Sequence, residues 1–523
     1  MISRRYAVAA SAALAGINLP LRSTALPRCS AFVSTPRLKH DRTSDLHFQP
    51  STLSPRYHFK SRSSPSHWPR AWPVKESAFK SFHSQSRLNG AAEGRTIPSV
   101  SVSDAFDGGN GELVATSWDG DETTVTVRIR PDKYTELEEK SHFQYFCFRS
   151  TISGVSEPTK VKYEIANAGE ASYAPAWEGF TTFASTDLNT PESWMRKLDS
   201  SFDSEKGVLS WTHSFEKSGS AYFAYFPPFS YERHLDLVAR CASTADCSVE
   251  TLGQTLDGRE LECVTVGTGP RKCWIIHRQH PGENMAEYFA EGLLSRLLGL
   301  EAGGSVDGTS KRLRDMYTFF IVPNMNPDGA VRGHLRTNAS GANLNREWAP
   351  TGDYDAPTLH RSPEVYYVLK RMDETGVDAF LDVHGDEELP FNFLAGSEGG
   401  TNWGPRLEAL HGAFLAAYQR ANSDVQQNIS YEPDKPLEGM TNVGSTQISN
   451  RFDCLSGTLE MPFKDCVSNP DPTRGWNPAR AKSLGTSLLD ALLYVHPYLR
   501  TKSEFWKSLP ANDAYVRPND KYK

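Results

Sequence analysis

The chain has 523 residues, of which 38% are hydrophobic and 23% are charged, and its formal net charge is −7 at pH 7. This length allows two or three domains with buried cores. No uninterrupted apolar stretch reaches the roughly 18 residues of a membrane-spanning helix, so we expect no membrane span.

The first 95 residues differ in kind from the rest. Twelve Lys or Arg lie within residues 1–75, against two acids, Asp41 and Asp45. A basic, serine-rich, acid-poor leader is typical of a transit peptide, which predicts delivery to an organelle, a plastid or a mitochondrion. The short run Cys29-Ser30-Ala31-Phe32 resembles the junction of bipartite plastid leaders. The alternative is a disordered tail without an address, on a cytoplasmic protein.

Residues 96–235 are rich in β-strand signals. Apolar and polar residues alternate along 123–129, 161–165 and 208–215, with Gly, Asn, Asp and Ser between these runs. Short alternating strands at such spacing predict an antiparallel β-sandwich. The stretch 231–266 is interpreted as a bridge followed by the opening hairpin of the next domain, with Asp257-Gly258 as its turn.

Residues 236–500 alternate between strands and helices, which predicts an α/β domain. The predicted strands are short apolar runs, and the predicted helices carry apolar residues at helical spacing. The tail 501–523 is polar. The strands are 273–277, 317–322, 379–383 and 455–461, and the helices are 283–298, 363–372, 405–419 and 478–495. In open α/β sheets, functional sites gather beyond the carboxyl ends of the strands.

Three residues at such strand ends form the ligand set of a catalytic zinc. His280 and Glu283 lie at a strand-to-helix turn, and His384 follows the strand 379–383. Zinc in a hydrolytic site takes three protein ligands and leaves the fourth position for water. A His and a Glu three residues apart also occur by chance as a surface pair, so the prediction depends on the convergence of separate strands.

Glu460, at the end of the strand 455–461, is the candidate general base. A water activated by zinc needs a base beside it to accept its proton. The flanking residues Leu459, Met461, Pro462 and Phe463 are apolar, and apolar surroundings raise the pKa of a carboxyl group towards a useful range. The alternative is a solvated carboxylate at a strand end.

Five blocks of sequence occur in an informative order: His280-Pro281-Gly282-Glu283, 324–329, 341–348, His384-Gly385 and Thr458-Leu459-Glu460. With these blocks the chain resembles the zinc carboxypeptidases, specifically their cytosolic carboxypeptidase-like branch, over roughly residues 100 to 500. The aromatic run 222–231 is similar to that branch and not to the digestive enzymes. The resemblance implies a mixed-sheet α/β catalytic domain at 236–500, preceded by an antiparallel β-sandwich domain at 96–235.

The resemblance also implies roles for further residues. One zinc per chain would be held by the His–Glu–His set, Arg336 would polarise the scissile carbonyl, and Asn345 with Arg346 would grip the terminal carboxylate of the substrate. A planar guanidinium pairs bidentately with a carboxylate, so these roles suit arginine. The alternative for each arginine is a surface salt bridge. The implied activity is a metallocarboxypeptidase that hydrolyses C-terminal residues from peptides or protein tails.

The side-chain specificity stays open at this level. Arg451 could bind an acidic side chain, although Asp453 is close enough in sequence to neutralise it. The acids 386–388 would repel acidic substrates or accept basic ones, or they support the ligands or form a solvated loop. Digestive relatives carry a mobile tyrosine about two dozen residues before the base, and 436–447 contains none, so no tyrosine is assigned a catalytic role.

Two other functions remain possible from the sequence. Zinc-dependent deacylases of small N-acyl amino acids share the His–Glu–His arrangement, and a non-catalytic binding module would keep the fold while losing a ligand or the base. The leader contains no nucleic-acid-binding motif, so we expect no nucleic-acid partner. Apart from Cys29 the chain has seven cysteines without regular spacing, which predicts no disulfide framework. A small-loop disulfide between Cys241 and Cys247 is the alternative in an oxidising compartment. The sequence does not predict an oligomeric state.

Overall fold

The computed structural model describes residues 98–120, 122–301, 304–350, 355–501 and 504–505. The chain divides into two units, 1–81 and 82–523, and every described residue belongs to the second unit. The predicted transit peptide and most of the predicted polar tail therefore lie outside the described residues.

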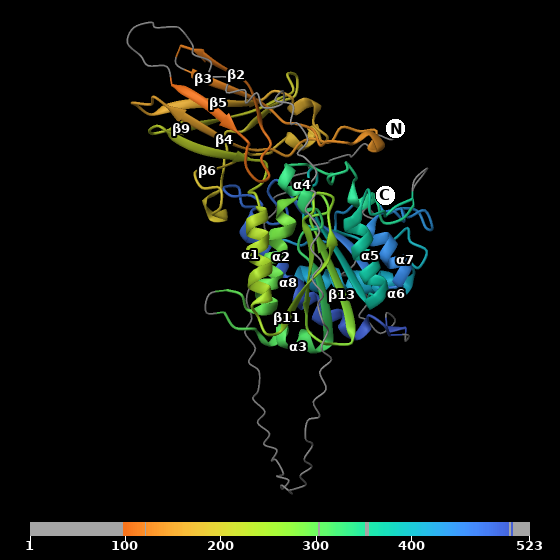
Figure 1. Cartoon of the computed structure of the whole chain (residues 1–523). Helices are drawn as coiled ribbons and strands as arrows, with labels where there is room; N and C mark the ends of the chain where they lie inside the picture. The colour runs from red at the N-terminus through yellow and green to blue at the C-terminus, as the bar shows by residue number, and fades with distance from the viewer. Residues whose placement is uncertain (1–97, 121, 302–303, 351–354, 502–503, 506–523) are drawn as a thin grey trace, which may run out of the picture. The chain divides into compact units, whose positions relative to one another are not determined.

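The described residues up to Phe226 form two five-stranded sheets (Figure 1). One sheet has the order β1-β4-β10-β6-β7, and the other has the order β2-β3-β5-β9-β8. The strand bounds of the first are Ser99–Ser103, Cys147–Ser153, Gly219–Ala224, Phe183–Ser185 and Met195–Arg196; those of the second are Glu112–Asp119, Glu122–Arg128, Thr159–Ile165, Val208–Phe215 and Ser201–Asp203.

Aromatic rings fill the space between these two sheets. The Phe223 ring on β10 lies 4.4 Å from the Tyr163 ring on β5, and Phe148 on β4 lies 6.3 Å from Trp211 on β9. Side chains along 161–165 of β5 alternate between buried and partly buried positions, as the sequence predicts. The predicted sandwich is confirmed, and its pairing is antiparallel except between β3 and β5, which run parallel.

The following region contains a mixed seven-stranded sheet of order β11-β12-β14-β13-β15-β17-β16. Strands β14, β13, β15 and β17 are parallel neighbours, whereas β11, β12 and β16 pair antiparallel at the edges. The bounds in sheet order are Cys247–Gln254, Glu260–Val266, Tyr317–Val322, Arg271–His277, Ala379–Asp386, Leu455–Pro462 and Phe393–Ala395. The predicted α/β fold is confirmed.

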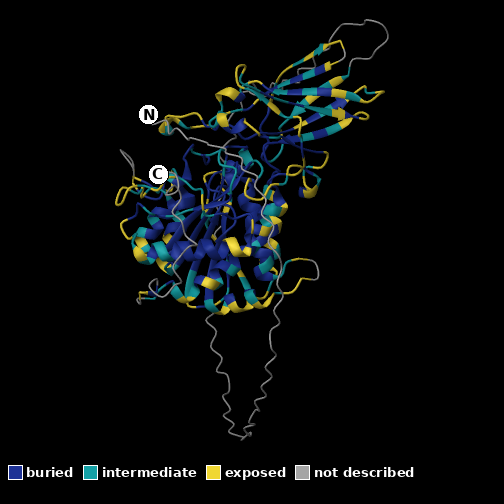
Figure 2. Cartoon of the chain, turned by 180° about the vertical axis from the view of Figure 1, so that it is seen from behind, coloured by how far each residue is buried: buried dark blue, intermediate teal, exposed yellow. Residues whose placement is uncertain are grey.

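Helices cover both faces of this sheet, which is why its central strands are buried (Figure 2). Buried side chains of α2, α6 and α8 belong to one core, and those of α5 and α7 belong to a second core on the opposite face. The helices are α1 Tyr231–Ala242, α2 Asn284–Leu298, α3 Gly308–Met316, α4 Pro327–Arg332, α5 Pro363–Thr375, α6 Pro405–Ala421, α7 Gly444–Phe452 and α8 Pro478–Val495. None of the helices in the described ranges is long and apolar enough to cross a membrane.

The sandwich and the seven-stranded region share buried contacts within the unit 82–523. Tyr225, just after β10, stacks on Phe463, just after β17, with ring centroids 4.4 Å apart. The Arg196 guanidinium donates hydrogen bonds to the carbonyl oxygens of Phe463 and Trp476 at 2.7 and 2.9 Å. The seven cysteines of the described ranges, including Cys241 and Cys247, are free thiols, so the small-loop disulfide is absent there.

Candidate active site

The turn between β13 and α2 brings His280 and Glu283 together. Arg278, at the start of this turn, has φ of 57°, a left-handed conformation that is uncommon for a residue other than glycine. Its guanidinium donates to the Pro281 carbonyl oxygen at 2.9 Å and pairs with Glu287 on α2 at 2.6 Å. The side chain of Arg278 therefore stabilises the turn that its own backbone begins.

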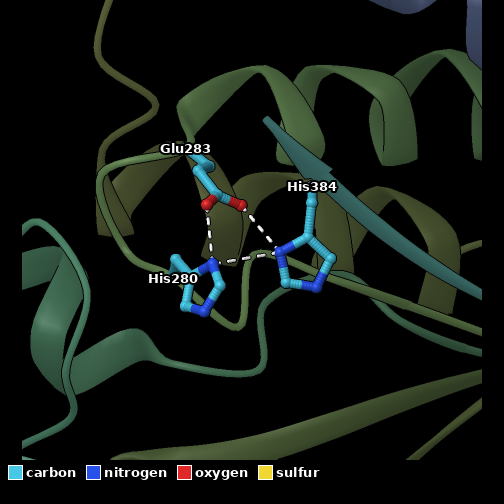
Figure 3. A group of neighbouring side chains, drawn as sticks. All are labelled: His280, Glu283 and His384. Carbon is cyan, nitrogen blue, oxygen red and sulfur yellow. Dashed lines mark hydrogen bonds and ion pairs between the residues drawn. The ribbon is translucent and has the colours of Figure 1, made fainter. Parts of the chain in front are cut away.

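His280, Glu283 and His384 form one buried group, and their ligand atoms lie within 4.8 Å of one another (Figure 3). His280 Nδ1 lies 2.6 Å from one oxygen of Glu283, and His384 Nδ1 lies 2.9 Å from the other. The two Nδ1 atoms are 3.1 Å apart. Within the described ranges this is the one cluster of His, Cys, Asp and Glu that could hold a metal ion.

The Nε2 atoms of the two imidazoles point away from the group and have other hydrogen-bond partners. His280 Nε2 lies 3.0 Å from Asn343 Oδ1, and His384 Nε2 lies 2.8 Å from a carboxylate oxygen of Asp382. Both partners are acceptors, so each Nε2 carries a proton, and each Nδ1 faces the centre of the group, where it would present its lone pair to a bound cation. Two such lone pairs facing one carboxylate fit a divalent cation, and zinc accepts this donor set.

The surroundings shift the pKa values of the three side chains in different directions. Burial and the nearby Arg336 lower the pKa of His280 to about 3, so this imidazole stays neutral. Burial opposes ionisation of Glu283, but the two imidazoles hold the pKa of that carboxyl well below its usual range. Burial opposes the charge of His384, but Asp382 and Glu283 raise the pKa of this imidazole well above its usual value, so His384 gives up a proton when a cation binds. His280 and Glu283 already have the forms in which these side chains bind metal.

Glu460 lies beside this group on the neighbouring strand. In the parallel pairing of β15 with β17, Glu460 is the register partner of His384. Burial raises the pKa of Glu460 well above its usual value, and its Oε2 is a buried atom without a hydrogen-bond partner in the part of the chain that the structure describes. Such an oxygen is available to a water or a substrate group.

Arg336 and Arg346 share one electrostatic environment. Burial disfavours the charge of Arg336, but Tyr173 and Glu387 raise its pKa above the usual value. Burial and the charge of Arg336 lower the pKa of Arg346 to about 10. Two half-buried guanidiniums that repel each other make this part of the site favourable for an anion.

Asn345 is buried in the short helix η5, Leu344–Arg346. Its Oδ1 accepts a hydrogen bond from the backbone N–H of Gly444 at 2.9 Å, which fixes the start of α7 against this loop. The side-chain oxygen is thus engaged, and the two N–H donors of the amide group are the part of Asn345 that suits an anion.

The structure does not place Arg451 with these residues. Its guanidinium forms a bidentate ion pair with Asp373 on α5, with both N–O distances at 2.6 Å. Asp453, which the sequence offered as the neutralising partner, pairs instead with Arg406 at 2.5 Å. Arg451 therefore carries an intramolecular partner on the outer side of α7, where both members of the pair are exposed.

The acids after His384 are not a freely solvated loop. Asp386 accepts hydrogen bonds from the backbone N–H groups of Glu388 and Leu389 and from the Tyr431 hydroxyl, the last at 2.5 Å. Glu387 is buried, and burial together with Glu283 raises its pKa well above the usual value.

Sequence reasoning missed three residues around the site. Asp382 precedes His384 by two positions on one strand, so period-two alternation would have placed both side chains on the same face. Asn343 carries no local signal, because its contact with His280 joins residues 63 positions apart. Tyr431 lies outside 436–447, where a tyrosine was sought, and its pKa is raised by burial and by Asp386 and Glu460.

The chain matches two family models in succession. Residues 102–226 match the cytosolic carboxypeptidase N-terminal domain, and residues 232–451 match zinc carboxypeptidase. The second range contains the His–Glu–His group, Arg336, Asn345 and Arg346, whereas Glu460 lies beyond its end.

One curated relative resembles the chain over most of its length, and others resemble it over about half of its length or less. An uncharacterised protein of Zymomonas mobilis is 39% identical over 393 residues, which cover 75% of this chain and 96% of that protein. Cytosolic carboxypeptidase 6 of Caenorhabditis elegans is 24% identical over 53% of this chain and 62% of its own length, so this chain spans less than two thirds of that relative.

Solved structures agree with these matches. A metallo-carboxypeptidase from Pseudomonas aeruginosa is 38% identical with a TM-score of 0.68, covering 76% of this chain and 100% of that one. A metallo-carboxypeptidase from Burkholderia cenocepacia is 39% identical with a TM-score of 0.68, covering 76% and 99%. These findings favour a carboxypeptidase over the deacylase of N-acyl amino acids. The chain belongs to the zinc carboxypeptidase family and is a metallocarboxypeptidase, a hydrolase that acts on peptides.

Proposed function

We propose that the enzyme binds one zinc through His280, Glu283 and His384 and hydrolyses the last peptide bond of peptides or protein tails with Glu460 as the general base. The observation that supports this best is the buried His–Glu–His group with Glu460 in register beside His384. When bound, zinc would lower the pKa of a water molecule and polarise the scissile carbonyl.

Glu460 has the properties of a proton carrier. Its raised pKa lets it accept a proton from the attacking water and release that proton to the leaving amine near neutral pH. Its unpartnered Oε2 is the atom that would take part in both transfers. A carboxylate that was tied up in hydrogen bonds could not exchange protons as readily.

Arg336 would stabilise the negative charge that develops on the carbonyl oxygen. A fixed guanidinium contributes most when it is positioned before the reaction, and a single donor of this kind contributes about 3 kcal/mol to the stability of the transition state. The charge of Arg336 is secured by its raised pKa.

Arg346 and the amide group of Asn345 would bind the free carboxylate of the substrate, which makes the enzyme an exopeptidase. A carboxylate between Arg336 and Arg346 would relieve the repulsion that lowers the pKa of Arg346. The relative from Pseudomonas aeruginosa was solved in complex with (2-guanidinoethylmercapto)succinic acid, a molecule with two carboxylates and a guanidine group, so it supports an anion site of this kind.

The proposal is tested with the full-length, zinc-loaded protein and a mixed peptide library, followed by mass spectrometry of the C-termini. We expect stepwise loss of single C-terminal residues and no internal cleavage. Glu460→Gln is the matched control, because it keeps the size of the side chain and removes its basicity. Intact peptides with wild-type protein, or equal shortening by Glu460→Gln, would contradict the proposal.

A second library with amidated C-termini tests the carboxylate site. Amidation removes the anion that Arg346 and Asn345 would bind, so we expect amidated peptides to be spared. The residues lost from free peptides also report the side-chain preference of the enzyme.

A further inference from the structure

A carboxylate of the sandwich region holds the backbone that carries Arg336. Asp132, in the loop after β3, is 5% exposed. One of its oxygens accepts the N–H of Leu335 at 2.7 Å, and the other accepts the N–H groups of Arg336 and Thr337, each at 2.8 Å. The Thr337 hydroxyl donates to the same carboxylate at 3.0 Å. Four donors from one tripeptide therefore converge on one buried side chain.

The same tripeptide touches the loop of the proposed zinc ligands on its other side. The carbonyl oxygen of Leu335 accepts the N–H of Gly282 at 3.0 Å. A Cβ atom at Gly282 would lie 2.9 Å from that oxygen, so only glycine allows this close approach. The segment 335–337 is thus held between Asp132 and the turn from His280 to Glu283.

A second acid of the sandwich region reaches the site nearby. Glu138 in η1, Glu136–Glu138, accepts the backbone N–H of Asn343 at 3.0 Å, and the Asn343 side chain contacts His280. Asn110 donates to the Gly333 carbonyl oxygen at 3.0 Å, just before the tripeptide. The sandwich region therefore contacts the site loops at several successive points.

The hydrogen bonds of the backbone at 335–337 position Arg336. Among the residues that the structure describes, no hydrogen bond from the Arg336 guanidinium is seen, so the direction of this side chain depends on the backbone at 335–337. Hydrogen bonds from N–H groups to an ionised carboxylate are stronger than those between neutral groups. A loss of the carboxylate would leave three buried N–H groups without their acceptor.

We propose that Asp132 is a positioning residue for catalysis, which acts by fixing the backbone that aims Arg336 at the scissile carbonyl. This role rests on the proposed function of Arg336. The sandwich region would then complete the active site and not merely precede it in the chain. A misplacement of about 1 Å at a catalytic group lowers the rate by about 10²-fold, so the effect of losing Asp132 should be of that size.

The test measures kcat and KM of full-length Asp132→Asn, which keeps the shape of the side chain but presents an amide group to the N–H donors. We expect kcat to fall about 10²-fold with KM nearly unchanged, because the oxyanion forms only in the transition state. Asp132→Glu keeps the charge and should recover part of the loss. Asp199→Asn is the matched control, since Asp199 also accepts a backbone N–H and the hydroxyl of one threonine, Thr212, at a distant hairpin of the sandwich.

A double-mutant cycle separates positioning from general stabilisation. If Asp132 acts through Arg336, Asp132→Asn should cost less than about threefold in kcat when Arg336→Ala is already present. An equal cost in both backgrounds, or a wild-type kcat in Asp132→Asn, would overturn the role of Asp132. Wild-type protein that cleaves no peptide would instead overturn the proposed function, so the two failures are distinguishable.

Amide hydrogen exchange gives a readout that does not depend on activity. We expect the amides of 335–337 to exchange faster in Asp132→Asn than in wild type or Asp199→Asn. Should Asp132→Asn fail to fold, Asp132→Glu is measured in its place, with the same expected direction. Unchanged exchange at 335–337 in a folded Asp132 variant would overturn the proposal.

Discussion

The sandwich and the seven-stranded sheet bury their strands in different ways. Strand β2 of the sandwich has no buried residue, whereas every residue of β14 and β17 is buried between helices. A sheet covered on both faces presents polar chemistry only at the ends of its strands. His280, His384 and Glu460 lie at such ends. The sandwich has no such constraint, and its loops supply Asp132 and Glu138 to the same site.

The largest expected effect is a loss of catalytic rate without a loss of folding stability, at Glu460 in the seven-stranded sheet. Glu460→Gln should lower kcat by about 10³-fold or more, because general base catalysis contributes up to about 10⁴-fold. The melting temperature should not fall, since a buried ionisable group is replaced by a neutral one of equal size. Steady-state kinetics and calorimetry check both points, and a variant with wild-type kcat would remove Glu460 from the mechanism.

The second prediction concerns the buried contacts of Arg196 between the sandwich and the seven-stranded region. Arg196 on β7 donates to the carbonyl oxygens of Phe463 and Trp476 and lies over the Phe183 ring at 3.8 Å. Arg196→Met should lower the free energy of unfolding by about 3 kcal/mol, because buried carbonyl groups lose their donors.

Denaturant titration measures the effect of Arg196→Met. Arg128→Met is the control, since Arg128 forms an exposed pair with Glu112 and should change stability by less than about 1 kcal/mol. Equal stability of the two variants would show that the buried contacts of Arg196 do not hold the regions together.

The smallest predicted effects concern the pH dependence of folding stability, and they have opposite signs in the two regions. In the sandwich, burial and Lys197 lower the pKa of His213 to about 4, below the usual 6.5. Neutral His213 stabilises the fold above pH 6.5, and this stability is lost as the pH falls from 6.5 towards 4. In the other region, burial is outweighed by Glu287 and Glu262, which raise the pKa of His234 to about 9. That stability is complete below pH 6.5 and is lost as the pH rises through 9.

Unfolding curves of two variants at pH 5, 7 and 9 check these signs. His213→Leu should lose less stability than wild type between pH 7 and pH 5, by roughly 1 kcal/mol after allowance for solvent screening. His234→Gln should lose less than wild type between pH 7 and pH 9. Wild-type pH dependence in both variants would contradict the assigned protonation states.

The strands of the buried sheet were the easiest elements to predict. Their continuous apolar runs gave Tyr317–Val322 with both ends correct, and Pro478 marked the start of α8, Pro478–Val495. In contrast, α7, Gly444–Phe452, has a polar sequence without helical spacing of apolar residues, and its first N–H is satisfied by Asn345 from 99 residues away. No local pattern contains that contact.

The residues of the candidate site also fall into those that the sequence predicts and those that it does not. His280, Glu283, His384 and Glu460 were predicted because each follows a recognisable strand, and the structure brings them together. Asp132 could not be found in this way, since its partners at 335–337 are 203 to 205 positions away and are backbone atoms, which have no sequence signature. Arg451 was a candidate to bind an acidic substrate side chain, and its pairing with Asp373 on α5 depends on how two helices pack.

Zinc titration into metal-free, full-length protein tests the central claim most directly. Calorimetry should show one zinc per chain for wild type and for Glu460→Gln. Binding should release protons mainly from His384, because burial of this imidazole is outweighed by Asp382 and Glu283, which raise its pKa, whereas His280 is already neutral. His384→Ala should lose most of this affinity. Wild-type protein that binds no zinc, or His384→Ala that binds it as tightly as wild type, would contradict the assignment of the His–Glu–His group as the metal centre.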